Sequence, residues 1–186
     1  MNNVDVGKSR LTIEDVLLVA QGKASLELSK NADFVQRIRR GADYLAHLLA
    51  DEGVVYGVNT GYGDSCTVAV PPHLVADLPL HLTRYHGCGL GEFLDEEATL
   101  AVLVCRLNSL AQGYSGVRYE LLEQLAALIR LRILPLIPQE GSVGASGDLT
   151  PLSYVAAALI GEREVRFDGR ERPAAEVLAE QGLIPL

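Results

Sequence analysis

Apolar side chains recur at helical spacing along most of the chain. Between residues 13 and 20 they follow the i, i+3, i+4, i+7 rule, with Thr12 placed to cap the helix and Gly22 to end it. Similar patterns, bounded by capping residues, glycines or prolines, predict further helices at residues 31–52, 71–87, 95–110, 118–134, 151–160 and 173–181. These patterns together predict a mainly α fold.

Three short segments favour extended structure instead. Residues 24–29 alternate apolar and polar side chains, as a half-buried strand does. Residues 54–58 are rich in valine and form either a strand or an extended entry to the loop that begins at Asn59. Residues 165–170 predict a hairpin that turns at an Asp-Gly pair. We therefore expect a little β structure among the helices.

Composition excludes several classes of partner. The 186 residues carry 16 basic and 24 acidic side chains, a formal charge of −8, which argues against nucleic acid and anionic membranes. No apolar run approaches the length of a membrane span, and the N-terminus has no apolar signal region, so we expect a cytoplasmic protein. The three cysteines, Cys66, Cys88 and Cys105, fit neither a disulfide framework nor a zinc pattern, and we expect no metal.

The stretch GSVGASGDLTPL, residues 141–152, is unusually rich in small residues. It lacks the lysine of a phosphate-binding P-loop, and Asp148 stands where a nucleophile elbow needs glycine. Local composition alone predicts a mobile loop in which Asp148 caps the next helix. We call residues 141–152 the glycine-rich stretch.

A second motif changes that interpretation. The order ASGDL within the glycine-rich stretch occurs together with VYGVNTGYG, residues 55–63, which we call the tyrosine loop. With both motifs the chain resembles the histidine and aromatic amino-acid ammonia-lyase family. The resemblance covers nearly the whole chain, with the order and spacing of the family's N-terminal part.

The resemblance implies a cofactor made from the chain itself. In this family an Ala-Ser-Gly triplet, here Ala145, Ser146 and Gly147, cyclises to 4-methylidene-imidazol-5-one (MIO). Cyclisation brings the amide nitrogen of Gly147 onto the carbonyl carbon of Ala145, and a residue without Cβ suits so tight a turn. Dehydration of Ser146 then gives an electrophile that activates the substrate amine. Asp148 either orients this turn or caps the following helix, and it can do both.

The resemblance also implies roles for the tyrosine loop. Tyr56 is the base that removes the β proton, and Asn59 supports the loop. Gly63 and Leu149 line the substrate pocket. Without the resemblance, these residues are respectively a tyrosine that closes a strand, a loop polar residue, a turn glycine and an apolar contact at a helix start.

Substrate choice is expected to depend on residues 81–89, HLTRYHGCG, which align with the family's selectivity segment. Histidine lyases typically carry Ser-His there, tyrosine lyases His-Leu and phenylalanine lyases Phe-Leu. The pair here is Tyr85 and His86, so His86 matches the histidine type and Tyr85 departs from every type. Without a substrate, His86 is a histidine at a helix end.

The resemblance finally implies an organisation. Residues 1–94 form a small N-terminal α(+β) domain, and residues 95–186 form the start of a long helical bundle, incomplete here. Family members are homotetramers that share active sites between subunits and bind a small aromatic amino acid. We expect this chain to be part of a longer lyase or aminomutase, inactive and uncyclised when isolated. The alternative is a truncated, non-catalytic helical remnant.

Overall fold

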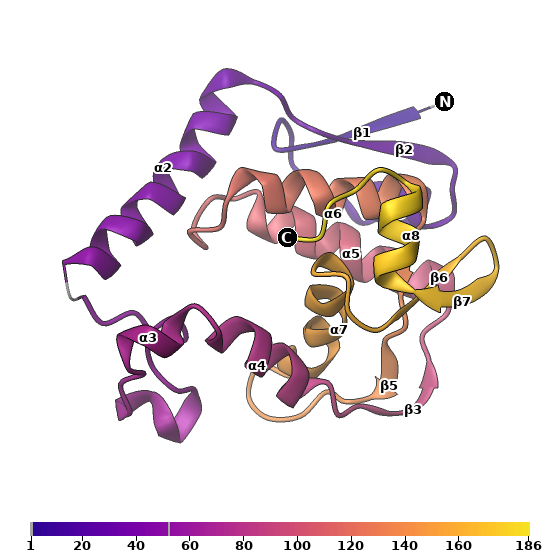
Figure 1. Cartoon of the computed structure of the whole chain (residues 1–186). Helices are drawn as coiled ribbons and strands as arrows, with labels where there is room; N and C mark the ends of the chain where they lie inside the picture. Colours follow the sequence, from indigo (N-terminus) through magenta and orange to yellow (C-terminus); the bar gives the residue numbers. More distant parts are fainter. Residues whose placement is uncertain (1, 52) are drawn as a thin grey trace.

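The computed structural model describes residues 2–51 and 53–186, and helices dominate it (Figure 1). The helices are α1 (Ile13–Ala20), α2 (Ala32–Ala50), the 3-10 helix η1 (Gly63–Thr67), α3 (Pro72–Val75), α4 (Leu78–His86), α5 (Glu96–Leu110), α6 (Tyr119–Leu131), α7 (Leu149–Leu159) and α8 (Ala174–Glu180). The strands are β1 (Asn2–Val6), β2 (Ala24–Leu28), β3 (Leu90–Phe93), β4 (Leu134–Pro135), β5 (Pro138–Glu140), β6 (Glu164–Phe167) and β7 (Arg170–Pro173). The predicted mainly α fold is confirmed.

The N-terminal elements form a small β-α-β unit. Strands β1 and β2 pair in parallel, with Val4 opposite Leu26. Parallel strands cannot be joined by a tight turn, so α1 provides the crossover between them. A capping box fixes the start of α1, because Asp15 N donates to Thr12 Oγ1 at 3.1 Å and Thr12 N donates to Asp15 Oδ2 at 3.0 Å. The predicted helix and the strand at residues 24–29 are confirmed; β1 was not predicted.

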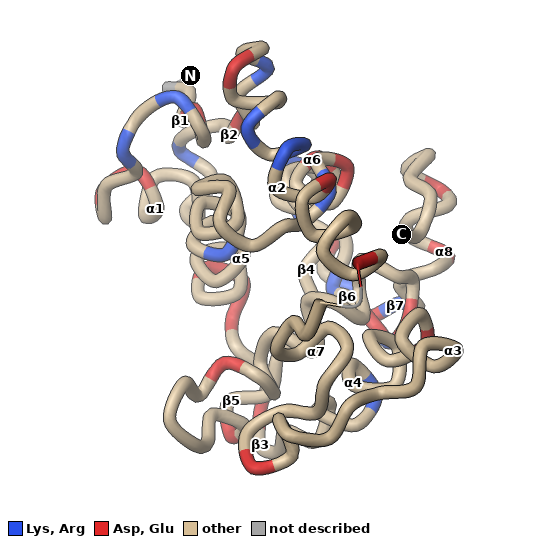
Figure 2. The backbone as a smooth tube through the Cα atoms, turned by 90° about the vertical axis from the view of Figure 1, so that its left-hand side faces the viewer, with Lys and Arg blue, Asp and Glu red and all other residues tan. Residues whose placement is uncertain are grey.

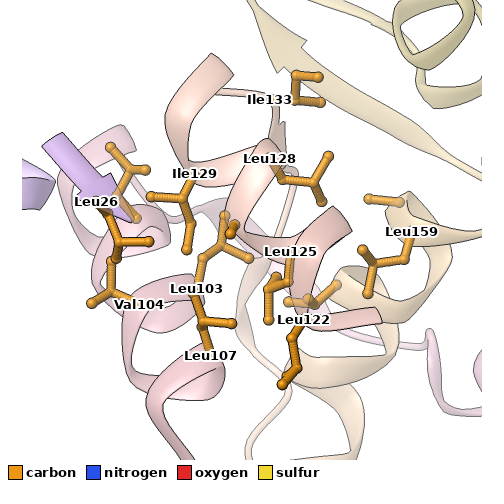
Figure 3. Close-up of a cluster of buried hydrophobic side chains, with 14 of the residues drawn as sticks. Leu26, Leu103, Val104, Leu107, Leu122, Leu125, Leu128, Ile129, Ile133 and Leu159 are labelled. Carbon is orange, nitrogen blue, oxygen red and sulfur yellow. The ribbon is translucent and has the colours of Figure 1, made fainter. Parts of the chain in front are cut away.

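Helices α5 and α6 form the centre of the core (Figure 3). Leu103 and Leu107 of α5 face Leu122 and Leu125 of α6, and all four side chains are fully buried. The cluster also includes Leu26 of β2 together with apolar side chains of α7 and α8. Since one continuous core includes residues from both sides of position 94, the division into domains at 94/95 stays a prediction.

Several predicted boundaries differ from the structure, and the helix predicted from residue 151 already begins at Leu149. The helix predicted over residues 118–134 ends at Leu131, because Arg132 adopts a left-handed conformation (φ +53°) and the chain then enters β4. The helix predicted to reach residue 52 ends at Ala50, and position 52 lies outside the described residues. Residues 54–58 are an extended entry and turn rather than a strand.

Helices α3 and α4 occupy one side of the molecule, and α7 lies between α4 and the α5–α6 pair (Figure 1). The helix predicted over residues 71–87 is thus two helices, interrupted at Ala76 and Asp77. Strands β3 and β5, neither of which was predicted, pair antiparallel, with Leu90 opposite Glu140. This pairing brings the chain just after α4 alongside the chain just before the glycine-rich stretch.

The C-terminal part follows the sequence closely. Strands β6 and β7 form the predicted hairpin, and its turn residues Asp168 and Gly169 both have positive φ, +50° and +70°. A two-residue type I′ turn requires positive φ at both positions, which explains the Asp-Gly pair. Strand β4 adds to β6, and α8 starts directly after Pro173, which occupies the N-cap position.

Charged residues of both signs are interspersed over the elements (Figure 2). The helices of residues 2–51 and 53–186 include none that is both long and apolar enough to cross a membrane.

Candidate functional site

The side chain of Asn59 fixes the conformation of the tyrosine loop. Its Oδ1 accepts a hydrogen bond from Val55 N at 2.8 Å, and its Nδ2 donates to the Gly53 carbonyl at 2.8 Å. A side-chain amide that satisfies two backbone groups in this way replaces the ladder bonds that a strand would provide. The loop conformation around Tyr56 therefore depends on Asn59.

Tyr56 presents its hydroxyl at the surface of this loop. The side chain is 62% exposed, and its oxygen accepts a hydrogen bond from Gly63 N at 2.9 Å. Gly63 has φ +56°, a conformation that glycine adopts at little cost. A backbone N–H aimed at the phenol oxygen stabilises negative charge that develops there.

Tyr62, which the sequence did not single out, lies between Tyr56 and His86. Its ring is edge-on to Tyr56 at 5.8 Å and edge-on to His86 at 6.1 Å, measured between ring centroids. Its hydroxyl donates to the Gly57 carbonyl at 2.8 Å, and a Cβ added to Gly57 would lie 2.8 Å from the Tyr62 ring. Burial, and secondarily the neighbouring Tyr56, raise the pKa of Tyr62, which keeps its hydroxyl a donor.

His86 is the last residue of α4 and is half-buried. Its Nδ1 lies 3.0 Å from the Leu82 carbonyl oxygen. A carbonyl oxygen only accepts, so Nδ1 carries the proton and Nε2 of the neutral ring is an acceptor. Tyr85 stands edge-on to the His86 ring at 5.3 Å, and its side chain is 78% exposed.

The triplet lies in a tight exposed turn. Residues 144–146 form the turn, and Gly144 and Gly147 flank its centre with φ of +82° and +72°. A Cβ added to Gly147 would lie 2.6 Å from Ser142 Oγ, and at a φ of +72° a residue with a side chain would also be strained. The triplet fits the formation of MIO, because the residue whose amide must attack has no Cβ and directly follows a turn.

Asp148 and Leu149 follow the triplet at the start of α7. Asp148 occupies the N-cap position, but its side chain accepts no cap hydrogen bond from the helix. Two roles are expected for Asp148, orientation of the turn and capping of the helix. The structure does not contain the side-chain cap. Leu149 is 46% exposed at the first turn.

The chain just after α4 meets the glycine-rich stretch at Gly89, Gly141 and Thr150. A Cβ on Gly141 would lie 2.6 Å from Thr150 Cγ2 and 3.5 Å from the Gly89 Cα. A hollow of about 380 Å³ opens beside this contact, and its lining includes Cys88, Gln139, Glu140, Gly141, Ser142, Val143 and Thr150. Its size suits a small molecule. The selectivity segment and the base of the triplet loop therefore border one concave surface.

The chain that forms this surface matches a known protein family. The model described as "Aromatic amino acid lyase" matches residues 11–186. The chain belongs to the aromatic amino acid lyase family. A curated relative of this chain, the histidine ammonia-lyase of Staphylococcus aureus (strain JH9), is 41% identical over 176 residues, which are 95% of this chain and 34% of the relative.

Solved structures agree with the family's fold. A tyrosine aminomutase from Streptomyces globisporus superposes with a TM-score of 0.89 at 37% identity, over 99% of this chain and 34% of that protein. The ergothionase of Treponema denticola gives a TM-score of 0.92 at 29% identity, over 100% and 37%. Histidine ammonia-lyase from Trypanosoma cruzi gives 0.84 at 31%, over 99% and 36%. The chain thus spans about a third of the length of these relatives.

The structure brings some of the predicted site residues together. Tyr56, Gly63, Tyr85 and His86 form one group joined through Tyr62, whereas the approach of Gly141 to Gly89 involves the stretch before the triplet and not the triplet itself. Tyr62 stands inside the motif VYGVNTGYG, so its position was visible, but its contacts were not. Within the described residues, no three His, Cys, Asp or Glu side chains are grouped to hold a metal.

Proposed function

We propose that this chain is part of an ammonia-lyase that eliminates ammonia from an aromatic L-amino acid, with histidine the first substrate and urocanate the product. Tyrosine and phenylalanine are the next candidates. The observation that carries the proposal is the continuous series of ring contacts from Tyr56 through Tyr62 to His86. These contacts support the proposal because they join the candidate base to the candidate reader of the substrate side chain through one ring.

The reaction requires that a proton leave Cβ while the Cα–N bond breaks. The phenolate form of Tyr56 accepts the β proton and becomes the neutral phenol, and the electron pair of the C–H bond becomes the Cα=Cβ double bond as ammonia departs. The Gly63 amide, 2.9 Å from the Tyr56 oxygen, stabilises the negative charge of that phenolate before it takes the proton. An MIO group formed from Ala145, Ser146 and Gly147 would supply the electrophile that activates the amine for departure.

His86 favours a substrate with a polar ring. Its Nε2 is free to accept a hydrogen bond from an imidazole N–H or a phenol O–H, because Nδ1 is already committed to the Leu82 carbonyl. Phenylalanine offers no such donor and would leave Nε2 unpaired, which costs about 1–3 kcal/mol in a buried site. The 41% identity to a histidine ammonia-lyase supports the same order of substrates.

An aminomutase is the second candidate. The match to a tyrosine aminomutase, with a TM-score of 0.89 and 37% identity, supports it. A mutase and a lyase share the elimination step and differ in whether ammonia is returned to the β carbon. The first third of the protein contains the residues we assign to elimination and therefore serves either outcome.

The whole protein is proposed to be a homotetramer whose active sites combine several subunits. This chain supplies Tyr56, the selectivity pair and the triplet, and the remaining groups come from the rest of the polypeptide. The proposed domains, residues 1–94 and 95–186, divide the base and the selectivity pair from the triplet. A non-catalytic remnant would retain the helices but have no need of the triplet.

Product analysis of the full-length protein tests the proposal. L-Histidine, L-tyrosine and L-phenylalanine are each incubated with enzyme, and ammonia, the unsaturated acid and the β-amino acid are measured. Urocanate and ammonia in equal amounts from histidine support the lyase. A β-amino acid as the main product supports the aminomutase. A cyclised, folded protein that converts none of the three contradicts both.

A further inference from the structure

Four side chains join the end of α4 to α7 and to the residues that follow α7: Arg84, Tyr154, Glu162 and Arg163, which we call the clamp. Arg84 Nε donates to both carboxylate oxygens of Glu162, at 3.1 and 3.2 Å, and Arg84 Nη2 donates to the same carboxylate. The two residues are 78 positions apart in the sequence. This bidentate geometry fixes orientation as well as distance.

The other half of the clamp grips the backbone directly after His86. Arg163 Nη2 donates to the Gly87 carbonyl at 3.0 Å, and Gly89 N donates to Tyr154 Oη at 3.1 Å. The Arg163 guanidinium also lies 4.5 Å from the centre of the Tyr154 ring, so the two contacts support each other. A Cβ on Gly87 would overlap this guanidinium, so a larger residue at position 87 would require the Arg163 side chain to move.

The clamp connects the two halves of the candidate site through one helix. Helix α7 begins at Leu149, two residues after the triplet, and Tyr154 lies within it. Glu162 and Arg163 follow it after Gly161. A helix transmits position along its length as a rigid rod. The backbone beside His86 is therefore held relative to the same element that anchors the triplet.

We propose that the clamp is a positioning device that sets the location of the His86 ring relative to the triplet and so determines discrimination between polar and apolar aromatic substrates. The inference rests on the proposed function. None of the four clamp residues belongs to the candidate pocket, and each acts through backbone or through another side chain. They are positioning residues rather than catalytic ones.

Because the clamp is partly exposed, its positioning role can be tested separately from a contribution to the stability of the fold. The side chains of Arg84 and Glu162 are 55% and 29% exposed, and ion pairs of that kind contribute little to the stability of a fold. Arg163 has φ +62°, in the left-handed region that favours glycine. Replacement by glycine therefore relaxes the backbone while it removes the guanidinium, so Arg163→Gly tests the side chain without a backbone penalty.

The experiment measures kcat/KM of the full-length enzyme for histidine, tyrosine and phenylalanine in the variants Arg163→Gly, Arg163→Lys and Glu162→Gln. We expect Arg163→Gly to lower the histidine-to-phenylalanine ratio about 10-fold to 100-fold, as displacement of a positioned group does, with unchanged triplet mass and undiminished Tm. Arg163→Lys should restore part of the ratio. Glu162→Gln should lower it less, because the Arg163 contact remains.

Glu180→Gln is the matched control. Glu180 pairs with Arg172 through two guanidinium nitrogens at the hairpin and α8, in an exposed bidentate pair like that of Arg84 and Glu162. The Glu180→Gln enzyme should have the same histidine-to-phenylalanine ratio of kcat/KM as the wild type. A histidine-to-phenylalanine ratio within twofold of wild type in the Arg163→Gly enzyme would overturn the proposal.

Hydrogen exchange keeps the test independent of the proposed function. If the wild-type enzyme converts none of the three amino acids, the proposed function fails. The rate of amide hydrogen exchange over residues 86–90 then tests whether the clamp holds this segment in place. Faster exchange there in the Arg163→Gly protein than in the Glu180→Gln protein supports the clamp. Equal exchange in the two proteins overturns it.

Discussion

The ring of Tyr62 stands edge-on to the imidazole of His86, with 6.1 Å between the centroids. This contact joins the tyrosine loop to the end of α4, although the two residues belong to different predicted motifs. Because Tyr62 also touches Tyr56, its ring controls how far the candidate base lies from the candidate substrate reader.

We therefore expect Tyr62→Ala to lower kcat/KM of the full-length enzyme at least about 10-fold, since the lost ring leaves both neighbours free to move. Tyr62→Phe keeps both ring contacts and loses only the hydrogen bond to Gly57, which is typically worth about 0.5–1.5 kcal/mol of stability. It should retain most of the activity with a lower Tm. Equal activity of the Ala and Phe variants would contradict the bridging role.

Tyr56→Phe is expected to lower kcat about 10²-fold to 10⁴-fold, because the ring still packs against Tyr62 but the proton acceptor is gone. Steady-state kinetics checks the rate, and intact mass checks that the triplet is still cyclised. Tyr44→Phe is the control, since Tyr44 is an exposed tyrosine on α2, outside the proposed site. Near-normal turnover in the Tyr56→Phe enzyme would remove Tyr56 from the mechanism.

The triplet is expected to cyclise in the assembled full-length protein. Intact-mass spectrometry should find the loss of two waters, and Ser146→Ala should abolish that loss together with the activity. The isolated 186-residue chain should keep its full mass, because its triplet is exposed and the tetramer that we propose to compress the turn is absent. An active full-length enzyme of unmodified mass would exclude MIO.

His86→Leu should shift the substrate preference toward phenylalanine. The change removes the Nε2 acceptor, so the penalty of about 1–3 kcal/mol against an unpaired ring disappears, which corresponds to a 10-fold to 100-fold change in ratio. The measurement is kcat/KM for the three amino acids before and after substitution. If the ratios do not move, Tyr85, exposed beside His86, becomes the residue to test.

The ion pair between Arg84 and Glu162 should make the stability of the fold change with pH in the acidic range. The hydrogen bond from Arg84, followed by its charge, lowers the pKa of Glu162 below its ordinary value of 4.5. A carboxylate with a lowered folded-state pKa stabilises the fold above its unfolded-state pKa and loses that contribution as pH falls through the folded-state pKa. The pair is exposed, so the Tm difference between wild type and Glu162→Gln should be small; it should be constant above about pH 5 and shrink below pH 4.5. A difference that grows toward acid would contradict this assignment.

Local signals predicted much of the fold. Thr12 and Asp15 mark the start of α1, Asp168 and Gly169 the hairpin, and Asp95, whose Oδ1 accepts from Ala98 N at 2.7 Å, the start of α5. Each of these signals acts within a few residues, so the sequence alone contains it.

Features that depend on distant segments could not be predicted in this way. Strand β1 has only two valines among five residues, and it becomes a strand because β2 pairs with it after a crossover. Strands β3 and β5 are short and similarly depend on each other. The contacts of Tyr62 with His86 and of Arg84 with Glu162 arise from the packing of separate elements, which periodicity does not encode.

The close approach of Gly89 to Gly141 restricts where the substrate range of this protein can be altered. A side chain at position 89 would meet Pro138 and Thr150, and one at position 87 would meet Arg163. Laboratory evolution that randomises residues 85–89 should therefore recover folded, active variants that differ at 85 and 86 and retain glycine at 87 and 89.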